Sequence, residues 1–146
     1  MEFKTMYTKI SKEDIVEIAR QYKEAFTFSP WNLDLIEIRI CEYMSHPHFR
    51  GYVYLENDVV VSAALGMLQQ YYDGLRYQLT DLFTAKKYQN RGHASQLLDY
   101  IKKSLKEEGV TQIMLTSLND DLHNHFYNDK NGFETRTELC IKHFYL

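Results

Sequence analysis

The chain has 146 residues, of which 45% are hydrophobic and 25% are charged, which is the size and composition of one globular domain. Its net charge of -3 argues against a general binder of nucleic acids or membranes, and no apolar run approaches the roughly 18 residues of a membrane span. The N-terminus lacks the charged segment followed by an apolar one that marks a secretory signal, so we expect a cytoplasmic protein. The length predicts a single domain over residues 1–146. Cys41 and Cys140 lie far apart in the sequence, and we expect free, buried thiols rather than a disulfide.

The first part of the chain indicates one strand and two helices. Alternating residues predict a strand over residues 3–10, after which Ser11 can cap a helix and Asp14 can complete a capping box. Apolar residues at helical spacing continue this helix until Ser29-Pro30 ends it. A second helix follows Trp31-Asn32. It carries three acidic residues, which favour a solvated helix face over an acidic rim that attracts a cationic acceptor: Asp34, Glu37 and Glu42.

The middle of the chain predicts three consecutive antiparallel strands. Residues 51–56 and 59–71 form two of them, joined by Asn57-Asp58, a pair typical of a tight hairpin turn. Gly66 interrupts the second of these strands and indicates a bulge. After another turn, residues 75–84 return as the third strand.

The last third of the chain predicts a helix, a strand, a second helix and a pair of strands. Apolar residues at helical spacing mark a helix over residues 95–108, and residues 111–116 form a short buried strand. Residues 120–131 read as a polar helix that Gly132 interrupts. Two more segments complete a sheet of about seven strands with four helices, a mixed α/β (α+β) fold: residues 133–138 and 139–145.

Two histidine pairs invite a metal-site interpretation. They are His46 with His48 and His123 with His125. Zinc sites usually need three or four donors, and a pair supplies only two. We therefore expect no metal.

A short basic loop between the strand ending at Thr84 and the next helix organises the chain. The first N–H groups of a helix have no internal partner, and the helix dipole places partial positive charge there. Gly92 lacks a Cβ, so a ligand can approach the backbone closely. The loop lacks the Gly-Lys-Ser/Thr ending of a P-loop and the three glycines of a dinucleotide fingerprint. It predicts a phosphate or pyrophosphate site with three basic residues: Lys86, Lys87 and Arg91.

Within this loop, Gln89-x-x-Gly92-x-Ala94 resembles the Gln/Arg-x-x-Gly-x-Gly/Ala signature of the GNAT superfamily of N-acetyltransferases. Leu82-Phe83-Thr84 lies at the expected distance upstream, and Asn131-Gly132-Phe133 closes a later helix as the second motif of that family does. The alternative is an ordinary helix start with a glycine near its cap. The order of the predicted elements resembles the GNAT fold along nearly the whole chain. This resemblance implies a central mixed, mostly antiparallel sheet in which two parallel strands splay apart at the CoA site.

The same resemblance implies which residues contact acetyl-CoA. Leu82, Phe83 and Thr84 would offer backbone groups to the acetyl and pantetheine parts, and Asn119 would add a contact near the start of a later helix. The pyrophosphate would be held by the loop: Gln89, Asn90, Arg91, Gly92, His93 and Ala94.

Acetyl transfer to an amine also needs a route for protons. A lysine-like amine has a pKa of about 10.4, so having it neutral at pH 7 costs about 4–5 kcal/mol. Asp81 is the candidate base because it directly precedes the implied cofactor contacts, with Glu56 and Asp73 as weaker candidates. The alternative for Asp81 is a structural carboxylate.

The resemblance also implies Tyr127 as the acid that protonates the CoA sulfur. In the family the gap from this tyrosine to the glycine is one residue shorter, and the extra residue lies within residues 128–130. It can sit in a widened turn, or it can rotate Tyr127 away and put Asn128 in its place. Tyr127 can also be a packing residue of the core.

These features predict an enzyme that transfers an acetyl group from acetyl-CoA to a primary amine of a small molecule or protein. Alternatives are a non-catalytic acyl-CoA sensor or partner-binding domain and an enzyme for longer acyl chains. A third is an aminoglycoside-type resistance acetyltransferase, since Ser29-Pro30-Trp31 and Tyr71-Tyr72-Asp73-Gly74 resemble bacterial small-molecule acetyltransferases. We expect no nucleic-acid or membrane partner. A homodimer is favoured by the apolar end of residues 142–146, because the final strands of such folds often pair between subunits.

Overall fold

The computed structural model describes residues 2–6, 11–26 and 30–146, and it divides the chain into two compact units. The first runs from Met1 to Thr116 and the second from Ser117 to Leu146. The elements of the first unit are β1 (Glu2–Thr5), α1 (Lys12–Ala25), α2 (Leu33–Ser45), β2 (Phe49–Glu56), β3 (Val59–Tyr71), β4 (Gly74–Thr84), η1 (Lys86–Tyr88), α3 (His93–Glu107) and β5 (Val110–Leu115).

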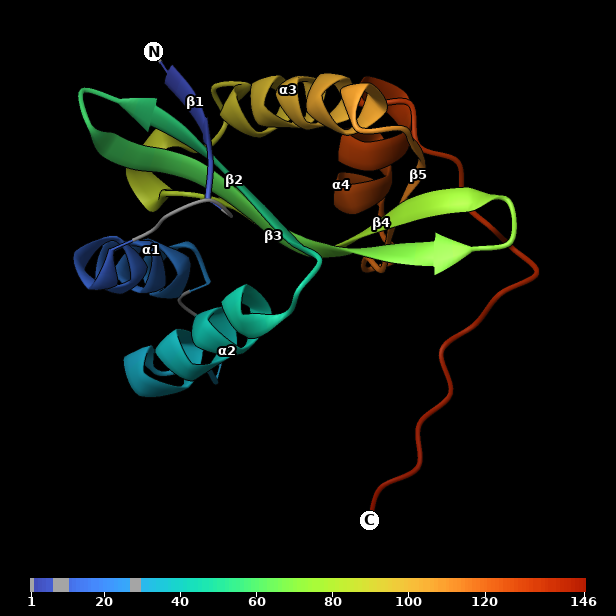
Figure 1. The fold of residues 1–146 in the computed structure, drawn as a ribbon, viewed down its shortest axis with the longest axis horizontal. Helices are drawn as coiled ribbons and strands as arrows, with labels where there is room; N and C mark the ends of the chain where they lie inside the picture. The colour runs from blue at the N-terminus through green and yellow to red at the C-terminus, as the bar shows by residue number, and fades with distance from the viewer. Residues whose placement is uncertain (1, 7–10, 27–29) are drawn as a thin grey trace. The chain divides into compact units, whose positions relative to one another are not determined.

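The first unit is built on a five-stranded sheet in the order β1-β2-β3-β4-β5 (Figure 1). Neighbouring strands are antiparallel except for β4 and β5, which are parallel. The predicted mixed, mostly antiparallel sheet is therefore confirmed. The strand predicted over residues 3–10 appears as β1, and its remainder, residues 7–10, lies outside the described residues, as does Ser29 at the predicted helix end.

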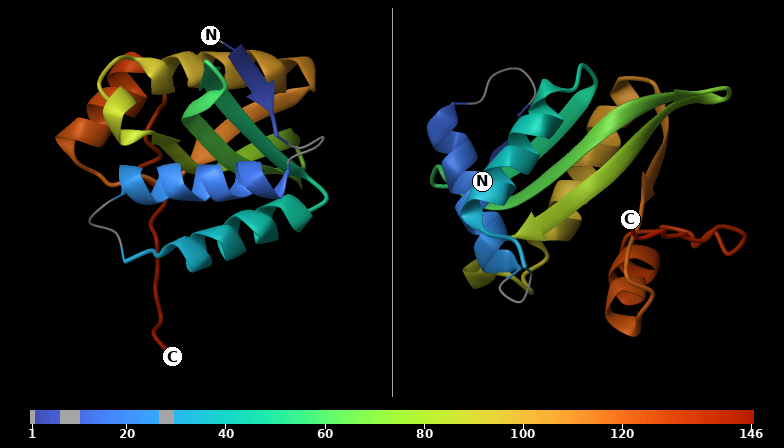
Figure 2. Two further views of the ribbon diagram at one scale, coloured as in Figure 1. Left: turned by 90° about the vertical axis from the view of Figure 1, so that its left-hand side faces the viewer. Right: turned by 90° about the horizontal axis from the view of Figure 1, so that it is seen from below.

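Helices cover both faces of this sheet. Helices α1 and α2 pack together and against one face, while α3 crosses the opposite face, as two views of the ribbon show (Figure 2). Capping explains where α1 begins, because Ser11 and Asp14 form the predicted capping box. The core between α1, α2 and the sheet is apolar and includes Ile18, Ile36 and Phe83. Among the described residues, no helix combines the length and apolar content needed to cross a membrane.

Two local irregularities shape the central hairpins. Asn57 and Asp58 both have positive φ, 50° and 62°, which is the backbone of the tight hairpin turn that the sequence predicts. The register between β3 and β4 shifts at Gly66, so the predicted bulge is confirmed. A Cβ at Gly66 would lie 2.3 Å from the carbonyl oxygen of Gln78 and 2.6 Å from the ring of Tyr77. Glycine is therefore required there by the close approach of β4.

The second unit contains one helical segment and an extended end. The predicted helix over residues 120–131 is formed by α4 (Asp121–Asn124) and by η2 (His125–Lys130), a π-helix.

The strands predicted over residues 133–138 and 139–145 are wrong, because these residues form no strand. A strand needs a neighbour for its backbone groups and a packed face, and a lone two-stranded ribbon is marginal in water. Here the apolar side chains of Leu139, Ile141 and Phe144 are exposed. Within residues 2–6, 11–26 and 30–146, the sheet consequently has five strands rather than about seven.

Candidate functional site

A bulge in β4 decides which side chains face α1 and α2. Leu65 pairs with Asp81 and Gly66 pairs with Leu79, so Thr80 is the extra residue on β4. Tyr77 packs on Tyr52, on the side of the sheet that α3 covers. In a regular strand Asp81 would face the same side, since side chains alternate with a period of two. The extra residue reverses the alternation and turns Asp81 toward α1.

The parallel strands β4 and β5 part at the same place. Their pairing ends with Leu79 opposite Leu115, while β4 continues to Thr84. Beyond Leu79, β4 is paired only with β3 in the part of the chain that the structure describes, and Phe83 pairs with Ala63. The edge of β4 from Thr80 to Thr84 thus lies open on the side of β5. This is where the sequence predicts that Leu82, Phe83 and Thr84 offer backbone groups to a ligand.

The basic loop after β4 has the backbone of a close-approach site. Asn90 and Gly92 have positive φ values of 62° and 80°. The Gln89 side chain donates a hydrogen bond of 3.0 Å to the carbonyl oxygen of Thr84 and so ties the loop to the end of β4. The amide of Gln89 therefore holds the loop in shape, and its part in holding a pyrophosphate stays a prediction.

The N-terminus of α3 is left without a side-chain cap. Side chains cap α1, α2 and α4, namely Ser11, Asn32 and Asp120, while the cap position of α3 is Gly92. Apart from its chain neighbours and the backbone of its own helix, no atom lies within 4 Å of the place that a Cβ of Gly92 would take, and Arg91 is exposed beside it. The first N–H groups of a helix need an acceptor, and an anion satisfies both them and the helix dipole.

His93, the first residue of α3, packs against two aromatic rings. Its ring lies 5.2 Å from that of Tyr54 and 6.1 Å from that of Tyr88, measured between centroids. The Nδ1 atom of His93 is buried and has no hydrogen-bond partner. The open space at Gly92, the basic loop and the unpartnered nitrogen together fit a pyrophosphate group.

Asp81 lies on the opposite face of the sheet from α3 and already has two partners. One carboxylate oxygen accepts a hydrogen bond of 2.9 Å from the hydroxyl of Tyr22, and the other accepts one of 3.1 Å from Nε of Arg39. The Asp81 side chain is only 9% exposed. Burial, together with the charge of Asp81, raises the pKa of Tyr22 above its usual value. The carboxylate is tied into the structure, and its role as a base stays a prediction.

The partners of Asp81 were not foreseen from the sequence, although a signal for one of them exists. Arg39 is the only basic residue of α2, and it lies between the buried Ile36 and Ile40 on the inward side of the helix. A charged residue on the buried side of a helix needs a partner of opposite charge. That signal points to Arg39 without revealing which carboxylate it meets.

In the second unit, Tyr127 lies within the π-helix η2. The backbone N–H of Phe133 donates to the carbonyl of Tyr127 (2.9 Å), and that of Gly132 donates to the carbonyl of Asn128 (3.2 Å). Each of these hydrogen bonds spans one residue more than the corresponding bond at the end of an α-helix. This geometry corresponds to the widened turn, one of the possibilities that the sequence leaves open. The ring packs edge-on against Phe126 and Phe133, and burial raises the pKa of Tyr127.

The other predicted contact of the second unit, Asn119, is exposed. Its side-chain oxygen accepts a hydrogen bond of 3.0 Å from Asn124. Its neighbour Asp120 caps α4 through the backbone N–H of His123.

No group of three or more potential metal ligands occurs among the residues that the structure describes. In the first histidine pair, His46 accepts a hydrogen bond from the backbone of His48, which is a local turn interaction. Cys41 and Cys140 are free, as predicted, but both are exposed, so the expectation of buried thiols is wrong. Cys41 lies on the outer side of α2, away from the buried stripe of that helix.

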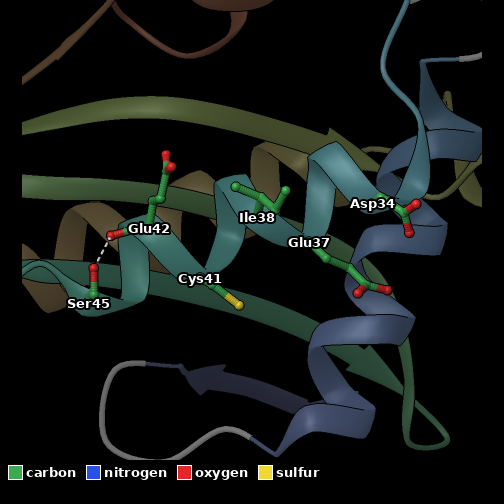
Figure 3. A pocket seen from close by; sticks show the side chains of 6 residues that line it. All are labelled: Asp34, Glu37, Ile38, Cys41, Glu42 and Ser45. Carbon is green, nitrogen blue, oxygen red and sulfur yellow. Dashed lines mark hydrogen bonds between the residues drawn. The ribbon is translucent and has the colours of Figure 1, made fainter.

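The outer side of α2 carries a shallow hollow (Figure 3). It is lined entirely from this one helix, and the acidic residues predicted there contribute to it. The lining residues are Asp34, Glu37, Ile38, Cys41, Glu42 and Ser45.

A family model described as Acetyltransferase (GNAT) family matches residues 13–133. Solved structures share the fold over the whole chain at low sequence identity. A protein described as a possible acetyltransferase from Clostridium difficile 630 is 15% identical with a TM-score of 0.79, over 99% of this chain and 98% of that one. Aminoglycoside N-acetyltransferase AAC(6')-Iy in complex with CoA is 14% identical with a TM-score of 0.75, over 98% and 93%. An aminoglycoside acetyltransferase from an uncultured soil metagenomic sample, in complex with sisomicin, is 14% identical with a TM-score of 0.74, over 99% and 94%. A search of curated protein sequences found no match.

Proposed function

Because this chain belongs to the GNAT acetyltransferase family, we propose that it transfers an acetyl group from acetyl-CoA to a primary amine of a small molecule or protein. The observation that carries the proposal is the uncapped N-terminus of α3, with open space at Gly92 and basic residues around it. The open edge of β4 supports it, since it starts where β5 leaves the sheet and leads directly into this loop. We propose that the reaction takes place in the cytoplasm.

The proposed cofactor contacts follow the chain from β4 into α3. The backbone of Leu82, Phe83 and Thr84 pairs with the acetyl and pantetheine parts. The loop from Gln89 to Ala94 surrounds the pyrophosphate, with Gln89 acting through its bond to Thr84. The N–H groups at the start of α3 and the charge of Arg91 supply the electrostatic attraction. Asn119 is the remaining proposed contact.

In the transfer step the amine nitrogen attacks the carbonyl carbon of the thioester. A C–N bond forms, the C–S bond breaks, and the leaving thiolate takes up a proton while the amine loses one. We assign the donated proton to the hydroxyl of Tyr127, which like any tyrosine carries its proton at neutral pH. The sequence leaves two roles open for Asp81, proton acceptor or structural carboxylate, and its hydrogen bonds with Tyr22 and Arg39 favour the second.

Calorimetry of acetyl-CoA and free CoA tests this function at the cofactor site. Gly92→Glu should abolish binding, because it fills the open space and places a negative charge where an anion binds. Gly109→Glu is the matched control: Gly109 follows the other end of α3, has φ of 82° against 80° at Gly92, and is equally open. Loss of binding in Gly92→Glu alone supports the proposal. A wild-type protein that binds neither compound, or equal binding by both variants, refutes it.

For the acceptor, we propose amines with several positive charges as the first compounds to test. Two of the proteins that share the fold are described as aminoglycoside acetyltransferases, and aminoglycosides are amines of this kind. CoA release should be measured with aminoglycosides, a polyamine and a lysine-containing peptide. Release with one class identifies the acceptor class, whereas binding without release across the panel favours the sensor alternative.

We also propose that the protein forms a homodimer through its C-terminal end. Five large apolar residues are exposed in the last eight positions: Leu139, Ile141, Phe144, Tyr145 and Leu146. Light scattering should give twice the chain mass of 17.4 kDa. A monomer at all concentrations contradicts this proposal.

A further inference from the structure

Three elements of the first unit meet at one carboxylate. Tyr22 comes from α1, Arg39 from α2 and Asp81 from β4, and the two hydrogen bonds that join them, 2.9 and 3.1 Å long, occupy different oxygens of Asp81. The pair of charges is largely removed from water, since the side chains of Asp81 and Arg39 are 9% and 31% exposed. The position of both helices on β4 is therefore fixed at this point.

Arg39 is itself held by aromatic rings. Its guanidinium carbon lies 5.2 Å from the ring centre of Trp31 and 4.8 Å from that of Tyr43. A planar guanidinium between rings and a carboxylate has little freedom left. Arg39 thus links Asp81 to Trp31, which directly precedes the cap of α2, and to Tyr43 in the last turn of that helix.

The cluster lies beside the proposed acetyl-binding edge. Asp81 follows Thr80, the extra residue of the bulge, whose hydroxyl donates a 2.8 Å hydrogen bond to the carbonyl of Leu65. It directly precedes Leu82, and Phe83 contacts the ring of Tyr22. Both oxygens of Asp81 already accept hydrogen bonds from the protein, and its side chain is only 9% exposed, so the carboxylate is used to join α1 and α2 to β4.

We propose that Asp81 is a positioning residue that acts through Arg39 to hold α1 and α2 beside β4 and thereby sets the affinity for the amine acceptor. This inference rests on the acetyl transfer proposed above. It assigns to Asp81, Arg39 and Tyr22 a role in the wall of the acceptor site rather than in proton transfer.

A double-mutant cycle tests the proposal with Asp81→Asn, Arg39→Gln and the double variant. We expect each single change to raise the KM for the best amine of the panel about tenfold, and the double variant to be no worse than either single one, because coupled residues are not additive. The kcat and the pH profile of kcat/KM should stay those of the wild type. Glu108→Gln is the matched control, since it breaks an Arg–carboxylate pair of 3.0 Å with Arg50 on the other face of the sheet.

A second readout does not depend on turnover. Trp31 is the only tryptophan of the chain, so its fluorescence reports on the guanidinium beside it. Asp81→Asn should change the emission of Trp31 in the same direction as Arg39→Gln, and Glu108→Gln should leave it unchanged. Trp31 emission that is unchanged in Asp81→Asn overturns the proposal even if no acceptor is found.

Other results overturn it in distinguishable ways. A large fall in kcat with an altered pH profile in Asp81→Asn, but not in Arg39→Gln, makes Asp81 the base. Additive effects of the two changes show that Arg39 does not carry the effect of Asp81. If Asp81→Asn unfolds because it strands the charge of Arg39, the double variant should fold again; a double variant that stays unfolded also counts against the proposal. Failure of the wild type to bind acetyl-CoA refutes the acetyl transfer alone.

Discussion

Gly66→Ala should destabilise the protein strongly, because the structure leaves no space for one more carbon atom. The added Cβ would lie 2.3 Å from the carbonyl oxygen of Gln78, 2.6 Å from the ring of Tyr77 and 2.7 Å from its hydroxyl. Backbone atoms cannot move aside as a flexible side chain does, so β4 must shift or the Tyr77 ring must leave its place.

The cost has two parts. Overpacking a dense core costs about 1–3 kcal/mol. Displacing Tyr77 also breaks the 2.7 Å hydrogen bond from its hydroxyl to the carbonyl of Arg50, and leaving such buried groups unpaired costs about 1–3 kcal/mol. The free energy of unfolding should fall by about 2–6 kcal/mol in total. The melting temperature should fall by about 5–20 °C for a chain of this size.

Urea unfolding followed by circular dichroism measures this change. Tyr77→Phe provides a cycle: in the wild type it costs about 1 kcal/mol, and in Gly66→Ala it should cost almost nothing, because the hydrogen bond is already lost. Gly109→Ala is the contrasting variant: at a φ of 82° it adds backbone strain but meets no atom beyond its chain neighbours within 4 Å, whereas Gly66 has no positive φ and its cost is crowding. If Gly66→Ala is as stable as the wild type, β3 and β4 do not approach each other as described and the bulge geometry is wrong.

The remaining predictions concern proton transfer, alkaline stability and thiol reactivity. Tyr127→Phe should lower kcat about a hundredfold while calorimetry shows unchanged acetyl-CoA affinity, and an unchanged kcat removes Tyr127 as the acid. Because burial and Asp81 raise the pKa of Tyr22 in the folded state, its contribution to stability is complete below about pH 10 and is lost as pH rises further. Above that pH, the free energy of unfolding measured by urea titration should fall as pH rises, and Tyr22→Phe should make this slope shallower by about 1.4 kcal/mol per pH unit. Equal slopes in the two proteins would contradict the raised pKa. Cys41 and Cys140 should both react with an aromatic disulfide reagent in the native protein, whereas fewer than two thiols released would show that one of them is covered.

Much of the first unit could be predicted because its signals are local. The capping box of Ser11 and Asp14, the positive φ values at Asn57-Asp58 and the bulge at Gly66 are all written in neighbouring residues, and all are confirmed. The loop from Gln89 to Ala94 was likewise located by its own residues and by its place between a strand and a helix.

The wrong predictions, and the contacts that the sequence does not reveal, depend on partners that are remote in sequence. Alternation over residues 133–145 predicts strands, but a strand forms only beside another strand. Cys41 was expected to be buried because cysteine usually is, yet α2 turns its Ile36 and Ile40 inward and leaves Cys41 outside. The partners of Asp81 are 42 and 59 residues away, at Arg39 and Tyr22, and no local pattern joins them.

Because Thr80 is an extra residue in β4, the number of residues in this strand, rather than the chemistry of Thr80, decides which side chains face α1. Many side chains could replace Thr80 and still leave an extra residue between Leu79 and Asp81. Deleting Thr80 restores simple alternation and turns Asp81 and Phe83 through half a turn, from the side of α1 to the side of α3. The loss of this one residue would move side chains from the layer beside α1 to the layer beside α3, an effect that no single substitution in the strand can produce.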